Sequence, residues 1–330
     1  MQRGSKIAAA IIALIACFLL VVNMIPPEKN VENNPFLVEK GELPLIAAHR
    51  GGAGEYPENT MMAFQNAIET VGVDIIESDL HLTKDGFLVF NHNNYIDETC
   101  NVNGDLSLEE VKELCKDTSK RHYIHNMTLE ELQQYNFGFY FEDEKGQRVY
   151  KDLEDPASVG LQITTLDQLF EKYYETYPDL LFILEIKGSQ SRGINGCKAL
   201  WEVLQQYPNY IDQVVVCTFH DEVETHLRDH YPQLLRGSST DTAVSFVVTQ
   251  LLWVNLFDQS DFACLQIPDD YGLGLLSARH LVDRAHHRGI AVQYWTINSK
   301  MQMRRLIALG CDCIMTDYPA LLKQVLEDYR

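Results

Sequence analysis

Two carboxylates and an imidazole within Leu45–Asn94 have the types and spacing needed for acid–base or metal-dependent chemistry. Glu77 and Asp79 are two positions apart in an apolar run, so their side chains lie on one face of the predicted strand. Asp85-Gly86 then predicts a two-residue hairpin turn, because Asp-Gly tolerates the positive φ of a type I′ turn. In that register Asp79 lies opposite His92, on the same face of the ladder.

Further charged side chains stand at the ends of other predicted strands. His49 and Arg50 close the apolar run before the first helix, and Glu185 and Lys187 close a later run. Glu77, Asp79 and Glu185 are thus three candidate carboxylate ligands, whose hard oxygens suit Mg²⁺ or Ca²⁺ rather than zinc. The sequence therefore predicts a divalent cation beside two basic side chains.

The basic side chains and the imidazoles among these groups offer charge neutralisation and proton transfer. Arg50 and Lys187 can neutralise the non-bridging oxygens of a phosphate. His49 and His92 have ordinary pKa values near neutrality, so that one can activate a nucleophile and the other can protonate a leaving alcohol. The net charge of −20 argues against nucleic acid, whose phosphates attract basic proteins.

Apolar runs of strand length alternate with amphipathic stretches of helical length, which indicates parallel strands joined by crossover helices. The expected strands are Leu45–Ala48, Val73–Ile76, Leu181–Ile186, Val214–Thr218, Leu234–Arg236, Cys264–Ile267, Ala291–Trp295 and Cys313–Thr316. They predict an α/β fold of the TIM (β/α)₈ barrel type, with Leu88–Asn91 as an additional hairpin arm. In such barrels active-site groups lie at the C-terminal ends of the strands.

Three segments leave alternatives open. The broken, polar segment of about 95–160 is expected to be an insertion after the hairpin. It is either a solvated decoration or, because of its aromatic residues, a cover over the substrate. The helix Thr242–Leu256 has little polar surface and is predicted to be buried, with a lipid-facing patch as the alternative. Cys100 and Cys115 are candidates for a disulfide if the domain faces an oxidising space.

The N-terminus carries a candidate membrane anchor. Residues 1–25 combine Arg3 and Lys6 with an apolar run that is just long enough to span a bilayer as a helix. The basic residues favour a single-pass anchor with the catalytic domain outside the cytoplasm; a cleaved signal peptide or a lipoprotein signal is the alternative. Residues 26–43 are expected to be a polar tether and residues 44–330 the catalytic domain.

Several short motifs, in their order, resemble the glycerophosphodiester phosphodiesterase family. They are His49-Arg50-Gly51, Glu58-Asn59-Thr60, Glu77-x-Asp79, Thr83-Lys84-Asp85-Gly86, His92, Glu185-x-Lys187, Trp295-Thr296-x-Asn298 and Thr316-Asp317-Tyr318-Pro319. The resemblance runs from about Pro44 to the C-terminus, with a divergent middle section.

The resemblance implies hydrolysis of a glycerophosphodiester to glycerol 3-phosphate and an alcohol. It places a divalent cation, Mg²⁺ or Ca²⁺, at Glu77, Asp79 and Glu185, and makes His49 and His92 the acid–base pair. Arg50 and Lys187 would bind the phosphate. The alternatives are a lysophospholipase D that acts on lysophospholipid in the bilayer and a non-catalytic binding module.

The resemblance also suggests roles for residues around this core. Glu58 and Asn59 would orient the first loop, and Trp295 and Phe219 would line the substrate site; a place in the barrel core is an equal alternative for Trp295. Asn93 stands where the family usually has Asp, so it can hold the neighbouring histidine by a hydrogen bond but not as an anion.

Overall fold

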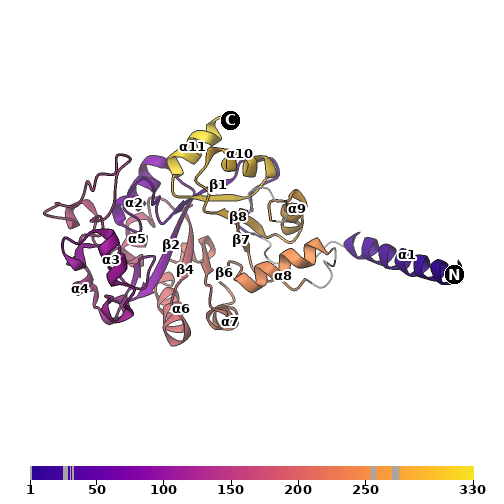
Figure 1. The fold of residues 1–330 in the computed structure, drawn as a ribbon, viewed down its shortest axis with the longest axis horizontal. Helices are drawn as coiled ribbons and strands as arrows, with labels where there is room; N and C mark the ends of the chain where they lie inside the picture. Colours follow the sequence, from indigo (N-terminus) through magenta and orange to yellow (C-terminus); the bar gives the residue numbers. More distant parts are fainter. Residues whose placement is uncertain are drawn as a thin grey trace.

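Eight parallel strands of the computed structural model form a barrel, with helices around its outside (Figure 1). The structure describes residues 2–24, 29, 31, 33–252, 254, 258–269, 274 and 276–330. The barrel strands are β1 (Leu45–His49), β2 (Ile75–Leu82), β4 (Leu181–Ile186), β5 (Val214–Cys217), β6 (Leu235–Arg236), β7 (Cys264–Pro268), β8 (Ala291–Trp295) and β9 (Cys313–Thr316).

Hydrogen bonds between β6 and β7 complete the barrel. The order of the sheet is β6-β5-β4-β2-β1-β9-β8-β7, which leaves β6 and β7 at its two edges. Across this gap Ser238 N donates to Cys264 O at 2.8 Å and Ala263 N donates to Arg236 O at 2.8 Å. The prediction of a (β/α)₈ barrel is therefore confirmed.

The helices begin where the sequence places capping side chains. Thr60 Oγ1 accepts from Ala63 N at the start of α2, and Ser239 Oγ accepts from Thr242 N at the start of α8. The barrel helices are α2 (Met61–Gln65, continued by a wider turn over Asn66–Val71), α5 (Leu166–Tyr173), α6 (Gln190–Leu204), α7 (Asp221–His230), α8 (Thr240–Leu251), α9 (Arg279–His287), α10 (Lys300–Leu309) and α11 (Pro319–Glu327).

The hairpin register differs by one residue from the predicted one. Strand β3 (Leu88–Phe90) pairs Leu82 with Leu88, and with Thr83 facing Phe87 the loop has three residues instead of two. Thr83 explains the difference, because its backbone N donates to Phe87 O and its hydroxyl accepts from Phe87 N. This pair closes a three-residue loop around Gly86, whose φ is 93°, as a turn with a bulge requires. Asp79 consequently pairs with Asn91 rather than with His92.

The insertion has its own small apolar core. It carries α3 (Leu108–Leu114) and α4 (Leu129–Leu132), on the side of the barrel away from α8 (Figure 1). Phe137 packs in one buried cluster, and Phe139 and Tyr140 pack in another. No described residue that lines the active-site cavity comes from this insertion.

The predicted Cys100–Cys115 disulfide is not formed. Both cysteines are free and buried, and they belong to two different apolar clusters. The Cys100 thiol instead donates to Ile96 O at 3.3 Å.

Helix α8 is only half buried, which corrects the prediction of a buried helix. Phe246 and Val247 face the barrel, whereas Val244, Val248 and Leu252 are exposed. The predicted helix continued to residue 256, and residues 253 and 255–257 lie outside the described part.

A segment before β1 closes the N-terminal end of the barrel. Phe36 is fully buried among the first residues of the strands, including Ala47, Ile75 and Cys313. Asn34 Nδ2 donates to Ala263 O at 2.8 Å and to Gly289 O at 2.9 Å. The C-terminal end of the barrel is therefore the end that is left for a site.

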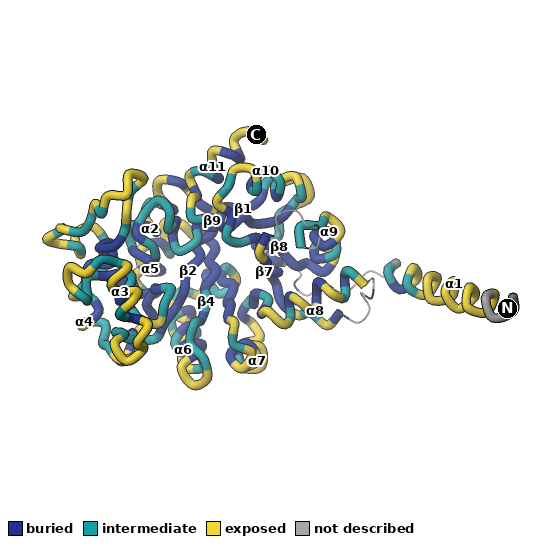
Figure 2. The backbone as a smooth tube through the Cα atoms, viewed as in Figure 1, coloured by how far each residue is buried: buried dark blue, intermediate teal, exposed yellow. Residues whose placement is uncertain are grey.

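One described helix is long and apolar enough to cross a membrane, although a signal sequence would satisfy the same criteria. Helix α1 (Gln2–Met24) contains the span Lys6–Asn23, with a mean hydropathy of 2.5. Most of its described side chains are exposed, but Val22 is buried (Figure 2).

Candidate active site

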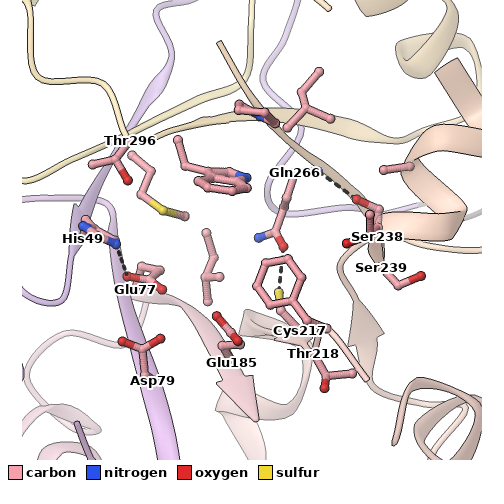
Figure 3. A pocket seen from close by; sticks show the side chains of 18 of the residues that line it. His49, Glu77, Asp79, Glu185, Cys217, Thr218, Ser238, Ser239, Gln266 and Thr296 are labelled. Atoms are coloured by element: carbon pink, nitrogen blue, oxygen red, sulfur yellow. Dashed lines mark hydrogen bonds and ion pairs between the residues drawn. The ribbon is translucent and has the colours of Figure 1, made fainter. Parts of the chain in front are cut away.

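A cavity of about 560 Å³ opens at the C-terminal ends of the strands. One part of its wall is charged, and Figure 3 shows Glu77, Asp79 and Glu185 directed toward a common space. The charged residues that line it are His49, Arg50, Glu77, Asp79, His92, Glu185 and Lys187. The structure thus brings together all seven residues that were predicted to be catalytic, phosphate-binding or metal-binding.

Strand pairing sets the spacing of these groups. In the β1–β2 ladder His49 pairs with Glu77, and in the β2–β4 ladder Asp79 pairs with Glu185. Paired residues of neighbouring strands point to the same side, so two carboxylates stand next to each other and a third stands next to an imidazole. This arrangement depends on the barrel strands and is unaffected by the shifted hairpin register.

His49 is held between two carboxylates. Its Nδ1 is 2.5 Å from Asp317 Oδ1, and its Nε2 is 4.0 Å from Glu77 Oε2. Burial alone would lower the pKa of His49, but Glu77 and Asp317 outweigh it and raise this pKa. Asn298 Nδ2 donates to Asp317 Oδ2 at 2.6 Å and fixes the carboxylate in turn.

Arg50 follows β1 in a left-handed backbone conformation, with φ of 51°. This conformation lets its backbone N donate to Glu77 Oε2 at 3.0 Å. The guanidinium makes an ion pair with Glu58 at 3.0 Å and a longer one with Asp79 at 3.5 Å. Asn59 N donates to Arg50 O at 2.9 Å, so Glu58 and Asn59 both contact Arg50 in the first loop.

Lys187 bridges two of the acids. Its Nζ is 3.2 Å from Asp79 Oδ1 and 3.1 Å from Glu185 Oε1. Burial raises the pKa of Glu185. Burial also raises the pKa of Glu77, to about 7; repulsion by Asp79 adds to this rise and His49 opposes it. The acids are thus crowded enough to favour an additional positive charge.

His92 faces the same cavity from the chain that follows β3. Burial, helped by the positive charges of Arg50 and Lys187, lowers its pKa to about 4 despite Asp79. His81 Nε2 donates to His92 O at 3.3 Å and anchors this turn. The two histidines of the predicted acid–base pair therefore have pKa values displaced in opposite directions.

Phe219 and Trp295 both line the cavity. Phe219 follows β5 and is 56% exposed, whereas Trp295 ends β8 and is partly buried. Their positions agree with the predicted substrate-lining place, and Trp295 also contacts the barrel core.

The sequence analysis gave no role to three supporting residues, although two of them lie in the motifs that carry the family resemblance. Asp317 and Asn298 hold His49, and both lie in motifs just after the ends of strands, which was a usable signal. His81 received no role in the sequence analysis, but it is 7% exposed and supports the turn that carries His92. The signal was its spacing, because 77, 79 and 81 alternate onto one face of β2.

Glu77, Asp79 and Glu185 have the ligand chemistry that a hard divalent cation requires. Asp79 is buried, and its Oδ2 accepts no hydrogen bond although Arg50 Nε lies 3.5 Å away, so this oxygen keeps a lone pair for a further ligand. Carboxylate oxygens from separate strand ends are ligands of the type that Mg²⁺ and Ca²⁺ take. Among the described residues, no three acids or imidazoles are already arranged around one point as a complete metal site.

The model of the glycerophosphoryl diester phosphodiesterase family matches residues 49–321. The chain belongs to this family. The matched region begins at His49 and includes every residue of the charged wall.

Curated relatives of this phosphodiesterase family cover most of the chain. It is 27% identical over 278 residues to a glycerophosphodiester phosphodiesterase of Caldanaerobacter subterraneus, covering 84% of this chain and 96% of the relative. It is 26% identical over 302 residues to the mouse lysophospholipase D GDPD1, covering 86% of each chain.

Solved structures show the same fold. The chain matches an Oleispira antarctica phosphodiesterase in complex with its product sn-glycerol-3-phosphate, with a TM-score of 0.62 and 22% identity over 86% of this chain and 97% of that one. A phosphodiesterase domain from Mycobacterium tuberculosis matches with a TM-score of 0.66 and 20% identity over 86% and 99%.

The Asp317 contact predicts a measurable change at His49. In Asp317→Asn one of the two anions that raise the pKa of His49 is lost and Glu77 remains, so this pKa should fall. Histidine-selective NMR titration measures it, with His49→Gln to assign the signal. Asn298→Ala keeps the Asp317 carboxylate and should shift the pKa of His49 less; equal values in wild type and Asp317→Asn would contradict the described contact.

Proposed function

We propose that this phosphodiesterase hydrolyses glycerophosphodiesters to glycerol 3-phosphate and an alcohol, with a divalent cation and two histidines. The observation that supports this most directly is the convergence of His49, His92 and three carboxylates on one cavity. A non-catalytic binding module would not need two imidazoles with oppositely displaced pKa values beside such a cluster.

Glu77, Asp79 and Glu185 would hold Mg²⁺ or Ca²⁺. The cation would supply charge neutralisation at the non-bridging oxygens of the phosphate. Lys187 contacts two of the acids, and its Nζ stays within reach of a bound phosphate beside them. Arg50, held by Glu58, presents its guanidinium from the other side.

The histidines divide the proton transfers between them. His92 starts neutral and takes the proton of the glycerol 2-hydroxyl as its oxygen bonds to phosphorus. His49 starts protonated, because Asp317 holds its Nδ1, and gives its proton to the alcohol oxygen as the P–O bond breaks. Water then opens the cyclic phosphate with the two roles exchanged.

Removal of the cation should abolish activity. EDTA treatment followed by titration with Mg²⁺ or Ca²⁺ measures the requirement. Glu185→Gln should raise the half-saturating concentration by at least about tenfold, since losing even a residue behind a ligand costs 10–100-fold. Glu171→Gln on the exposed side of α5 is the matched control. Full activity in the metal-stripped wild type would refute the cation.

Loss of either histidine should cost about 10²–10⁴ in kcat, the usual contribution of a positioned acid or base. In the double variant the losses should not add, because the two groups act in one step. His280→Ala, on the exposed side of α9, controls for loss of an imidazole. The measurement is kcat for glycerophosphocholine, and near-normal turnover of His92→Ala would remove it from the mechanism.

We further infer that α1 anchors the enzyme as a single-pass helix with the barrel outside the cytoplasm. Arg3 and Lys6 before the apolar span support this orientation. Protease added to intact cells should then digest the barrel domain and leave a short anchored fragment. A domain that is protected until the membrane is permeabilised would reverse the orientation.

The mouse relative, a lysophospholipase D, motivates a second candidate function. A lysophospholipid is a glycerophosphodiester with one acyl chain on its glycerol, so the same charged wall would serve both reactions. The choice between them depends on whether the cavity has a place for the acyl chain.

A further inference from the structure

The wall of the cavity opposite the acids is apolar. Its side chains come from the loop after β5, from α8 and from the segment before α9, namely Phe219, Ala243, Val244, Val247, Val248 and Leu276. Four of these six belong to α8 at helical spacing, so one stripe of this helix borders the cavity. A small polar alcohol gains nothing from such a wall.

The apolar stripe continues beyond the cavity. Val244 and Val248 of α8 and its C-cap residue Leu252 recur at every fourth position and are 57%, 45% and 63% exposed. Phe219 extends the exposed apolar surface at the mouth, with 56% of its side chain open to solvent. Contiguous exposed apolar surface on a soluble domain usually marks a binding site. We call Val244, Val248 and Leu252 the α8 ridge.

The dimensions of the ridge suit one acyl chain. From Ala243 to Leu252 the helix rises nine residues, which is about 14 Å. One leaflet of a bilayer contributes about half of the roughly 30 Å hydrocarbon core, so an extended acyl chain has nearly the same length. The charged end of the cavity then holds the phosphate while the chain lies along α8.

The position of α8 also suits a ligand drawn from a bilayer. In the view of Figure 1, α8 points toward the end of α1, the helix that could cross a membrane. Asn34 is fixed on the barrel, so only ten residue steps separate it from Met24, and these reach at most about 36 Å. The barrel therefore stays close to any membrane that contains α1.

We propose that the α8 ridge and the adjoining apolar wall bind the acyl chain of a lysophospholipid. This inference rests on the proposed phosphodiesterase activity. In the net reaction the oxygen of water bonds to phosphorus, the P–O bond to the headgroup alcohol breaks and that oxygen takes a proton. The products are a lysophosphatidate and the free alcohol.

The test compares glycerophosphocholine with lysophosphatidylcholines of six, ten and fourteen acyl carbons, using the full chain in lipid nanodiscs. We expect kcat/KM to rise with acyl length, by up to about fourfold for each methylene that becomes buried. The readout is the ratio of kcat/KM for the ten-carbon lysolipid to that for glycerophosphocholine.

Val248→Asp should lower this ratio at least about tenfold, because it places a charge on the apolar wall. Ser245→Asp puts the same charge on an exposed position of the same helix outside the cavity and should keep the wild-type ratio. Val248→Thr keeps the shape of the side chain and should lower the ratio by a smaller factor, which guards against misfolding of the first variant.

Hydrolysis of glycerophosphocholine without any gain from acyl length would overturn the acyl-chain site and leave the proposed function standing. Equal ratios in Val248→Asp and Ser245→Asp would also overturn the acyl-chain site, because the position of the charge on α8 would then not matter. Hydrolysis of neither substrate by the wild type would refute the proposed function and this inference together.

Discussion

The structure depends most on the charge balance at the C-terminal end of the barrel. Arg50, Lys187 and a protonated His49 face more carboxylates than they can balance, namely Glu58, Glu77, Asp79, Glu185 and Asp317. Burial, with repulsion by Asp79, raises the pKa of Glu77 although His49 opposes the rise. The cluster therefore has a negative excess, which a divalent cation would offset.

The barrel fixes the geometry that this balance requires. Neighbouring parallel strands place His49 beside Glu77 and Asp79 beside Glu185. Phe36 and Asn34 close the opposite end, so the strand ends that carry the acids have a packed core beneath them. A closely packed core holds the strands in place and keeps the side chains at their ends in fixed rotamers. The charged groups of the site therefore keep the distances at which they interact.

The fold could largely be predicted because strand-length apolar runs alternate with amphipathic helical stretches along the sequence. The charged wall could be predicted because its residues stand at the C-terminal ends of those strands. The hairpin register could not, since it depends on Thr83, whose backbone and hydroxyl together close a longer loop. The half-exposed state of α8 was also not readable, because an apolar helix has the same composition whether it faces a core or a ligand. The hold of Asp317 on His49 joins residues 268 positions apart and needs the closed barrel.

A crystal structure with glycerol 3-phosphate and Mn²⁺ would test this charge balance most directly, because anomalous scattering locates the ion. The account predicts one anomalous peak bound by Glu77, Asp79 and Glu185, with the phosphate between that ion, Arg50 and Lys187. It also predicts that His49 and His92 contact oxygens on different sides of the phosphorus. A phosphate bound in this cavity without an ion at the three acids, or an ion bound elsewhere, would contradict it.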